Sequence, residues 1–213
     1  MAALVEVSRY VKSFPSAALA RWGSLPPWEL TAQSSAVVRE LLAALPQHEF
    51  TFAEAVAVHR SALVEPGAVL KGPLILGAGC FVAAGAYLRD GIWIGENCSF
   101  GPGVEVKSSF VFAGTALAHF NFVGDSVLGE NVNLEAGSII CNSRNERAAK
   151  EVLVRVGPAL HRTGCEKFGA LVGDGSRIGA NAVVAPGALL PPRTVLGRTE
   201  LCDQEVSGIE THG

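Results

Sequence analysis

The segment 118–142 holds one histidine and three asparagines among small and apolar residues: His119, Asn121, Asn133 and Asn142. Histidine titrates near neutral pH and can therefore take a proton from a reacting group. Asparagine amides both donate and accept hydrogen bonds, as a ligand rich in hydroxyl groups requires. A single histidine is more often structural than catalytic, but this setting favours His119 as a general base.

Three basic residues recur at one constant interval along the chain: Lys71, Arg89 and Lys107. If that interval is one structural repeat, the three side chains stack on one edge, where like charges repel. Such a stack needs either a bound anion or acidic neighbours, and basic pairs are common clamps for phosphate. The pattern predicts a phosphate site at Arg89 and Lys107, or else a solvated edge balanced by Asp90 and Glu105.

The chain around these residues repeats with a period of six, and glycine or asparagine is frequent within each repeat. Both residues tolerate the positive φ of a sharp corner, and a short fixed period indicates an all-β solenoid with three repeats per coil. Cys80 and Cys98 fall one coil apart at inward positions, where we expect reduced core residues. Other inward residues are expected at Phe52, Val58, Val64, Leu70, Leu76, Val82, Leu88, Ile94, Phe100, Val106, Phe112 and Ala118.

The period changes just after His119. The core is expected to continue, with two shortened steps, at Val123, Leu128, Leu134 and Ile140. The segment 143–167 has no hexads: residues 151–156 alternate, Gly157-Pro158 favours a turn, and residues 159–163 can form a returning strand. We therefore expect a protruding β-hairpin arm, after which the hexads resume.

The N-terminal segment 1–50 is expected to be helical and to pack on the end of the solenoid. Apolar residues with helical spacing run from Trp28 to Leu45, Pro27 suits a first helical turn, and Pro46 ends the helix. The chain thus divides into a helical segment 1–50, a β-helix 51–142, a hairpin insertion 143–167, a continued β-helix 168–202 and a polar, loose tail 203–213.

Composition narrows the function classes. The net charge of −3 argues against a nucleic-acid-binding surface, and no apolar run reaches the ~18 residues of a membrane span. The start of the chain lacks the basic region of a secretory signal, and the five cysteines favour a reducing compartment. We expect a cytoplasmic protein without nucleic-acid or membrane partners.

Two motifs, Pro27-Trp28-Glu29-Leu30 and Lys150-Glu151-Val152, join the spacing from His119 to Asn142 in indicating a family. Over residues 27–197 the chain resembles the acetyltransferase half of the bifunctional N-acetylglucosamine-1-phosphate uridyltransferase/glucosamine-1-phosphate acetyltransferases. It resembles the archaeal-type sugar-1-phosphate nucleotidylyl/acetyltransferases more closely still. The resemblance implies a left-handed parallel β-helix, a homotrimer with active sites between neighbours, and N-acetylation of an amino-sugar 1-phosphate by acetyl-CoA without a metal.

By the same resemblance His119 is the general base, and Arg89 and Lys107 hold the phosphate of the sugar. Further acceptor contacts correspond to Phe122, Asn133 and Asn142, and the acetyl-CoA contacts correspond to Ala136 and Ala180.

The chain departs from the family in three respects. Phe122 stands where the family has tyrosine, so a hydroxyl near the sugar is lost and the acceptor can differ. The family's lysine after the final asparagine has two counterparts here, Lys150 and Lys167. No glycine-rich nucleotide loop precedes the helix, and the segment 1–50 is too short for a nucleotide-binding domain, so nucleotidyl transfer is not expected.

Three other functions stay open. An acetyltransferase of the same type can act on another amino sugar, including a nucleotide-linked or galacto-configured one. A γ-type carbonic anhydrase shares the fold but needs three histidine ligands, and only His59 and His119 lie within regular hexads, on different faces. A non-catalytic scaffold with the hairpin as its binding arm has no use for His119 among three asparagines.

Overall fold

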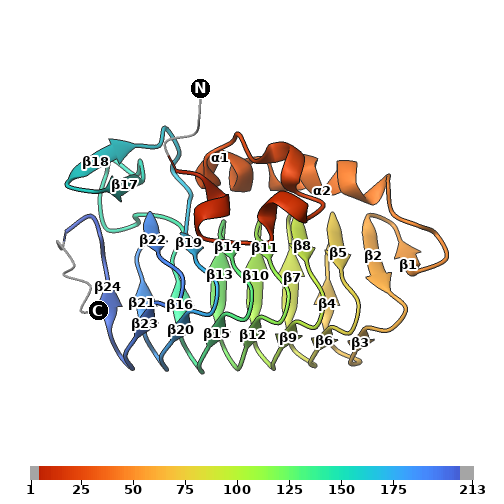
Figure 1. Cartoon of the computed structure of the whole chain (residues 1–213). Helices are drawn as coiled ribbons and strands as arrows, with labels where there is room; N and C mark the ends of the chain where they lie inside the picture. Colours follow the sequence, from red (N-terminus) through yellow and green to blue (C-terminus); the bar gives the residue numbers. More distant parts are fainter. Residues whose placement is uncertain (1–4, 207–213) are drawn as a thin grey trace.

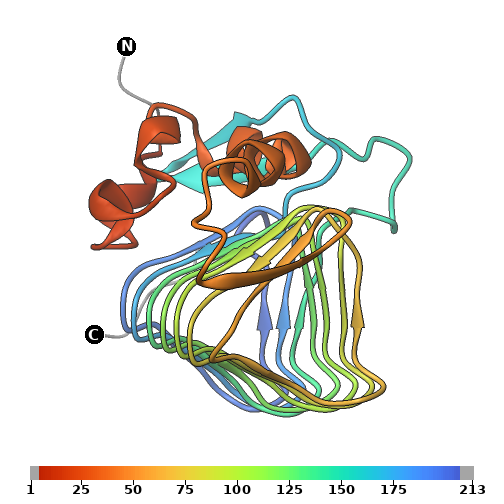
Figure 2. The same cartoon turned by 90° about the vertical axis from the view of Figure 1, so that its right-hand side faces the viewer.

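Most of the chain forms a triangular prism of short parallel strands, seen from the side in Figure 1 and along its axis in Figure 2. The structure is a computed structural model that describes residues 5–206. Three sheets, here called sheets A, B and C, form the three faces, and each coil visits them in that order. The coils wind as a left-handed parallel β-helix, which confirms the fold class expected from the sequence.

Each face contains one strand from every coil. Sheet A contains β1 (Phe50–Ala53), β2 (Val56–His59), β5 (Leu74–Leu76), β8 (Ile92–Ile94), β11 (Phe110–Val111), β14 (Val127–Leu128), β19 (Ala170–Val172) and β22 (Ala188–Leu190). Sheet B contains β3 (Leu63–Val64), β6 (Phe81–Val82), β9 (Ser99–Phe100), β12 (Ala116–Leu117), β15 (Asn133–Leu134), β20 (Arg177–Ile178) and β23 (Val195–Leu196). Sheet C contains β4 (Val69–Leu70), β7 (Tyr87–Arg89), β10 (Glu105–Lys107), β13 (Phe122–Gly124), β16 (Ile139–Ile140), β21 (Val183–Val184) and β24 (Leu201–Cys202).

The interior is built from apolar side chains that stack from coil to coil. Leu88, Val106 and Val123 are register partners in sheet C, and all three are fully buried. Cys80 and Cys98 also point inward as free thiols, as predicted. The six-residue period therefore corresponds to one continuous apolar core that runs along the prism.

The coil shortens by one residue in the middle of the prism. Val82 pairs with Phe100 at the full repeat, whereas Phe100 pairs with Leu117 and not with Ala118, where the full repeat would place its partner. The first short step lies at the turn Ser108-Ser109, between β10 and β11. It therefore comes earlier than the sequence analysis placed it, which was just after His119.

This displaced step makes two of the expected inward positions wrong, because Val111 and Leu117 occupy the interior in place of Phe112 and Ala118. Phe112 is buried on the outer side of sheet A, beneath the N-terminal segment. A covered outer face selects apolar residues as an interior does, so the period alone did not distinguish the two sides. Phe52 was a further error: it lies in β1, pairs antiparallel with β2, and is 37% exposed.

The N-terminal segment forms a second layer on the outer face of sheet A. It contains η1 (Val7–Arg9), η2 (Phe14–Ser16), η3 (Ala20–Trp22), α1 (Pro27–Ala32) and α2 (Ser34–Leu42). The layer lies along the prism and not on its end, contrary to expectation (Figure 2), and the single expected helix is divided at Gln33. Aromatic contacts fasten it, with ring centroids 5.9 Å apart for Phe14 and Phe112. No helix within residues 5–206 is long and apolar enough to cross a membrane.

The predicted hairpin is formed by β17 (Leu153–Val156) and β18 (Ala159–Arg162), which pair antiparallel. Its base is anchored: Val152 and Val154 are fully buried in the apolar layer that covers sheet A. The outer strand β18 is largely exposed. The insertion therefore belongs to the same outer layer as the N-terminal helices.

Residues 203–206 are not loose, contrary to the expected tail. Asp203 and Glu205 form ion pairs with Arg144, which is 4% exposed. The side-chain amide of Gln204 bonds to both backbone polar groups of Leu189, at 2.8 and 3.0 Å. The polar side chains of this stretch therefore form ion pairs and hydrogen bonds within the protein. The rest of the expected tail, residues 207–213, lies outside the described residues.

Candidate active site

His119 lies at the corner where the chain passes from β12 in sheet B to β13 in sheet C. Its side chain is exposed, and its ring makes no hydrogen bond within the part of the chain that the structure describes. Gly101 lies beneath it: a Cβ there would stand 1.6 Å from the carbonyl oxygen of Ala118 and 3.2 Å from Nδ1 of His119. The corner thus presents an imidazole available to a ligand, and the coil below admits only glycine.

Ala136 and Ala180 occupy the same edge as His119, in the next two coils. Backbone hydrogen bonds of 2.9 and 3.0 Å join the three corners. The N–H of Ala180 is already bonded to the Glu135 carboxylate at 2.9 Å. The pKa of this carboxyl is lowered mainly by its hydrogen bond from Arg198 and to a smaller extent by the Ala180 N–H. The N–H of Ala136 has no acceptor among the described residues. Of the two, Ala136 is the one that can offer a backbone donor to an oxyanion.

The outer face of sheet C connects His119 with the two basic residues. Phe122 is the register partner of Glu105, and Lys107 is the register partner of Arg89, so all four side chains lie on the outer side of the sheet. A Cβ built on Gly124 would lie 2.9 Å from Cζ of Phe122, so the ring extends across the face towards the basic pair. Within one chain, His119 and Phe122 therefore lie where the strands of sheet C begin, and Arg89 and Lys107 lie where these strands end.

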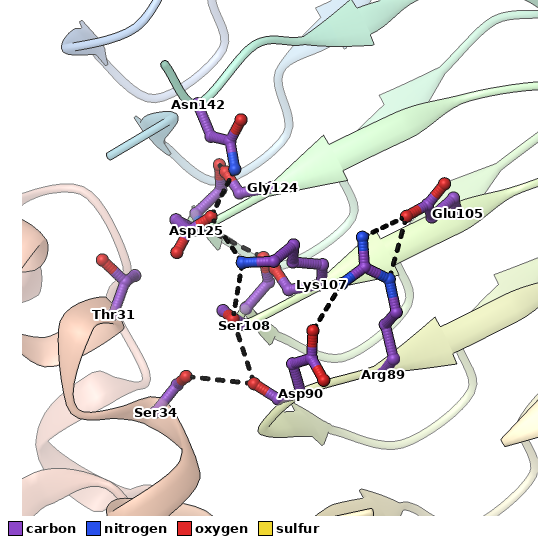
Figure 3. A network of polar contacts seen from close by, with 12 residues as sticks. Thr31, Ser34, Arg89, Asp90, Glu105, Lys107, Ser108, Gly124, Asp125 and Asn142 are labelled. Carbon is purple, nitrogen blue, oxygen red and sulfur yellow. Dashed lines mark hydrogen bonds and ion pairs between the residues drawn. The ribbon is translucent and has the colours of Figure 1, made fainter. Parts of the chain in front are cut away.

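Carboxylates already neutralise both basic side chains, as Figure 3 shows. Arg89 donates to Glu105 at 3.1 and 2.7 Å and forms an ion pair with Asp90. Nζ of Lys107 lies 3.3 Å from Oδ2 of Asp125. The sequence left two explanations for the stacked basic residues, a bound anion or acidic neighbours. The acidic neighbours are present within the chain itself.

Asn142 lies at the same edge as Lys107 and donates through Nδ2 to Oδ2 of Asp125 at 2.5 Å. Lys167 precedes Phe168, which donates its N–H to the Asn142 carbonyl at 3.0 Å, so the hydrogen-bonded backbone brings Lys167 back beside Asn142. Lys150 is exposed at the start of the hairpin.

The remaining polar candidates do not join this group. Asn133 is exposed on the outer face of sheet B, and Nζ of Lys71 lies 5.1 Å from the ring centroid of Tyr87. Asn121 is buried and donates to Oγ of Ser138 at 2.9 Å, so it holds two coils together and is not free to bind a ligand. The three asparagines near His119 therefore do not gather around one ligand within a single chain.

A hollow of about 280 Å³ opens beside Ala180 on the sheet B side of the His119 edge. Its walls include two arginines and the end of the last coil: Asn133, Glu135, Arg177, Val195 and Arg198. This is where Asn133 is found, one face away from Asn142.

Asp125 was not singled out from the sequence, although it contacts both Lys107 and Asn142. It belongs to a series of corner residues with positive φ between sheets C and A: Asp90 at 66°, Ser108 at 48° and Asp125 at 47°. The spacing within this series follows the coil length, and its second step is one residue shorter than its first. The missing signal was this shortened coil, which the sequence analysis placed too late.

The histidines among residues 5–206 do not combine into a metal site. Within residues 5–206 no group of three or more His, Cys, Asp or Glu side chains is arranged to hold a metal ion. Nδ1 of His59 is paired with Oγ of Ser61 at 2.8 Å, on a different edge from His119. The described part of one chain therefore does not assemble a three-histidine centre.

Comparison with known proteins identifies the repeat. Residues 74–108 match the family described as bacterial transferase hexapeptide (six repeats). The chain is 39% identical over 102 residues to a bifunctional sugar-1-phosphate nucleotidylyltransferase/acetyltransferase of Sulfurisphaera tokodaii, a match covering 48% of this chain and 25% of that protein. It is 30% identical over 131 residues to the uncharacterized acetyltransferase YaiX of Escherichia coli O6:K15:H31, covering 62% and 56% respectively.

Among solved structures, the acetyltransferase domain of PglB from Neisseria gonorrhoeae is similar, with a TM-score of 0.43 and 16% identity over 88% of this chain and 74% of that chain. The chain spans about a quarter of the Sulfurisphaera protein and just over half of the Escherichia protein. The chain thus carries the hexapeptide repeats of bacterial transferases and resembles, as its sequence indicated, the acetyltransferase half of the bifunctional sugar-1-phosphate enzymes.

Proposed function

We propose that the protein transfers an acetyl group from acetyl-CoA to the amine of an amino-sugar 1-phosphate, such as glucosamine 1-phosphate. The observation that carries this proposal is the position of His119, whose exposed ring lacks an internal partner among the described residues. His119 shares its edge with the small residues Ala136 and Ala180, and this edge borders the face that presents Phe122 and Arg89. The acetyltransferase names of similar proteins support the same reaction class.

In this reaction His119 takes a proton from the amine while the nitrogen attacks the thioester carbonyl. The new C–N bond turns the carbonyl oxygen into an oxyanion, for which the N–H of Ala136 is a suitable donor. The C–S bond then breaks, and the departing thiolate of CoA receives the proton from His119. Small side chains at Ala136 and Ala180 leave room for the donor along the edge.

The acceptor's phosphate is assigned mainly to Arg89. Its side chain is 26% exposed, against 15% for Lys107, so a ligand reaches Arg89 more readily. The phosphate must compete with Glu105 for the guanidinium, and its two negative charges favour it in that exchange.

A second candidate is an acetyltransferase for another amino sugar, including a nucleotide-linked one. The pairing of Arg89 with Glu105 and Asp90 favours it, because a cluster without excess positive charge does not require a terminal phosphate. Phe122, in place of the family's tyrosine, points to an altered acceptor as well.

We infer that the working form is a homotrimer with each active site between two protomers. The placement of Asn133 supports this inference: it is exposed on sheet B, whereas Asn142 lies at the far edge of sheet C. If sheet B of one protomer faces sheet C of the next, the partner's sheet B brings an asparagine to the face that holds Phe122.

Release of CoA from acetyl-CoA tests these proposals directly, with glucosamine 1-phosphate, glucosamine, galactosamine 1-phosphate and a uridine diphosphate amino sugar as acceptors. If the main proposal is correct, an amino-sugar 1-phosphate should give the highest kcat/KM of the four acceptors. Turnover confined to the nucleotide-linked acceptor selects the second candidate. No turnover, together with no binding of CoA by calorimetry, leaves the non-catalytic scaffold.

A further inference from the structure

Asp125 links Lys107 and Asn142, two polar side chains that the family resemblance assigns to the acceptor. It directly follows β13 and is 6% exposed. One of its carboxylate oxygens, Oδ2, accepts from Nζ of Lys107 at 3.3 Å and from Nδ2 of Asn142 at 2.5 Å (Figure 3). Among the described residues, no other carboxylate contacts either of these two side chains.

The backbone of Asp125 ties together the segments that carry these side chains. Its N–H donates to the carbonyl of Lys107 at 2.9 Å, and its carbonyl accepts the N–H of Gly169 at 2.9 Å. Gly169 begins the return of the chain from the insertion, next to Phe168, which bonds to Asn142. Asp125 is therefore a junction between β10, the end of β16 and the start of β19.

The carboxylate also determines which atoms stay available to a ligand. A lysine ammonium has three N–H donors; Asp125 and Oγ of Ser108, each 3.3 Å away, use two of them. An ionised carboxylate only accepts, so the amide of Asn142 must present its nitrogen to Asp125 and its oxygen to the other side. One N–H of Lys107 and Oδ1 of Asn142 thus remain unused within the described part of the chain.

Neighbouring groups hold this arrangement from the other side. Oγ of Ser108 donates to the carbonyl of Asp90 at 3.0 Å, and Oγ of Ser34, in α2, donates to the same carbonyl at 3.4 Å. Figure 3 shows the line of contacts from the helical layer to Asn142. Lys107 is therefore fixed by packing and by charge, not free to swing towards any anion.

We propose that Asp125 is a positioning residue for the acceptor: it orients Lys107 and Asn142 so that one donor and one acceptor atom face the amino sugar. The inference rests on the proposed function. It differs from a purely structural role, because it predicts that changes at Asp125 alter acceptor binding separately from donor binding and from stability.

The experiment compares Asp125→Asn with Asp174→Asn in the full chain. Asp174 is the matched control, since its carboxylate accepts two backbone N–H groups, of Lys12 and Glu130, at 2.8 and 2.7 Å, at a corner remote from Lys107. Asp125→Asn is expected to raise KM for the acceptor about tenfold, the effect of misplacing one hydrogen bond to a charged group, and to leave KM for acetyl-CoA within twofold. Asp174→Asn is expected to lower the Tm without changing either KM.

Asp125→Glu provides a second variant in case the amide does not fold: it keeps the charge but moves the oxygens by one methylene, and should also raise acceptor KM. Calorimetric titration with glucosamine 1-phosphate gives the same comparison without turnover. An acceptor KM unchanged in both Asp125 variants, or equal rises in both KM values, overturns the inference while the proposed function stands. A wild-type protein that neither binds nor acetylates an amino sugar rejects the proposed function, and the inference with it.

Discussion

Arg144 and Asp203 lie far apart in the sequence, yet both oxygens of Asp203 accept hydrogen bonds from the Arg144 guanidinium, at 2.7 and 2.8 Å. The side chains are 5% and 15% exposed. A planar guanidinium matches two carboxylate oxygens at once, so this pair fastens the insertion to the last coil.

Asp203→Asn should lower the free energy of unfolding by about 1.5–3 kcal/mol, because the buried Arg144 loses its charge-assisted hydrogen bonds to Asp203 but keeps its ion pair with Glu205. Urea denaturation at pH 7 measures the change. Glu6→Gln, which breaks the exposed pair with Arg9, is the control and should cost less than about 1 kcal/mol. Equal effects of the two substitutions would show that the buried pair contributes no more than a surface pair.

The same pair predicts a dependence of stability on pH. The hydrogen bond from Arg144 lowers the pKa of Asp203, and burial opposes this only in part. A carboxyl with a lowered folded-state pKa contributes stability above its unfolded pKa, about 3.9, and loses it as the pH falls through the folded value. Wild-type urea midpoints at pH 5, 4 and 3 should therefore fall more steeply than those of Asp203→Asn; parallel curves would contradict the assignment.

His119→Ala should reduce kcat about 10²–10⁴-fold, as expected for loss of a group that transfers a proton. The Tm should hardly change, because the ring is exposed and makes no hydrogen bond within the described residues. His59→Ala is the matched control, on another edge of the prism, and should keep full activity. Retained activity in His119→Ala, or unfolding of that variant, would assign His119 a structural role.

Arg89 should be the residue that reads the acceptor's phosphate. Glucosamine 1-phosphate is expected to raise the Tm of the wild type more than glucosamine does, and Arg89→Ala should abolish the difference. Glu105→Gln should enlarge it, because the carboxylate that competes for Arg89 is then neutral. Equal thermal shifts with the two ligands in the wild type would mean that this edge does not recognise phosphate.

Light scattering at micromolar concentration should give three times the chain mass of 22.2 kDa. Sheets B and C supply exposed apolar residues for such contacts, including Leu63 and Leu201, which are 61% and 66% exposed. A monomeric mass would contradict the trimer and leave each active site on one chain alone.

The sequence predicted the β-helix because each inward residue, such as Leu88 or Val106, has the same surroundings one coil later. It misplaced Phe112 because a side chain buried outside sheet A satisfies the same apolar requirement as one buried inside. The spacing from His119 to Asn142 was enough to make His119 a candidate general base. Asp125 could not be found in this way, because its partners Lys107 and Asn142 meet only after the coil has shortened by one residue.

The N-terminal layer on sheet A has a consequence for how large an assembly can grow. A prism with three bare faces can add neighbours on every side, and such repeated contacts produce open arrays instead of particles of fixed size. In the part of the chain that the structure describes, the helices and the hairpin cover one face and leave two faces open. In a closed ring, every copy buries the outer faces of its sheets B and C against its neighbours. Only the helical layers then face outwards, so no further copy can add through a sheet, and the layer limits the size of the assembly.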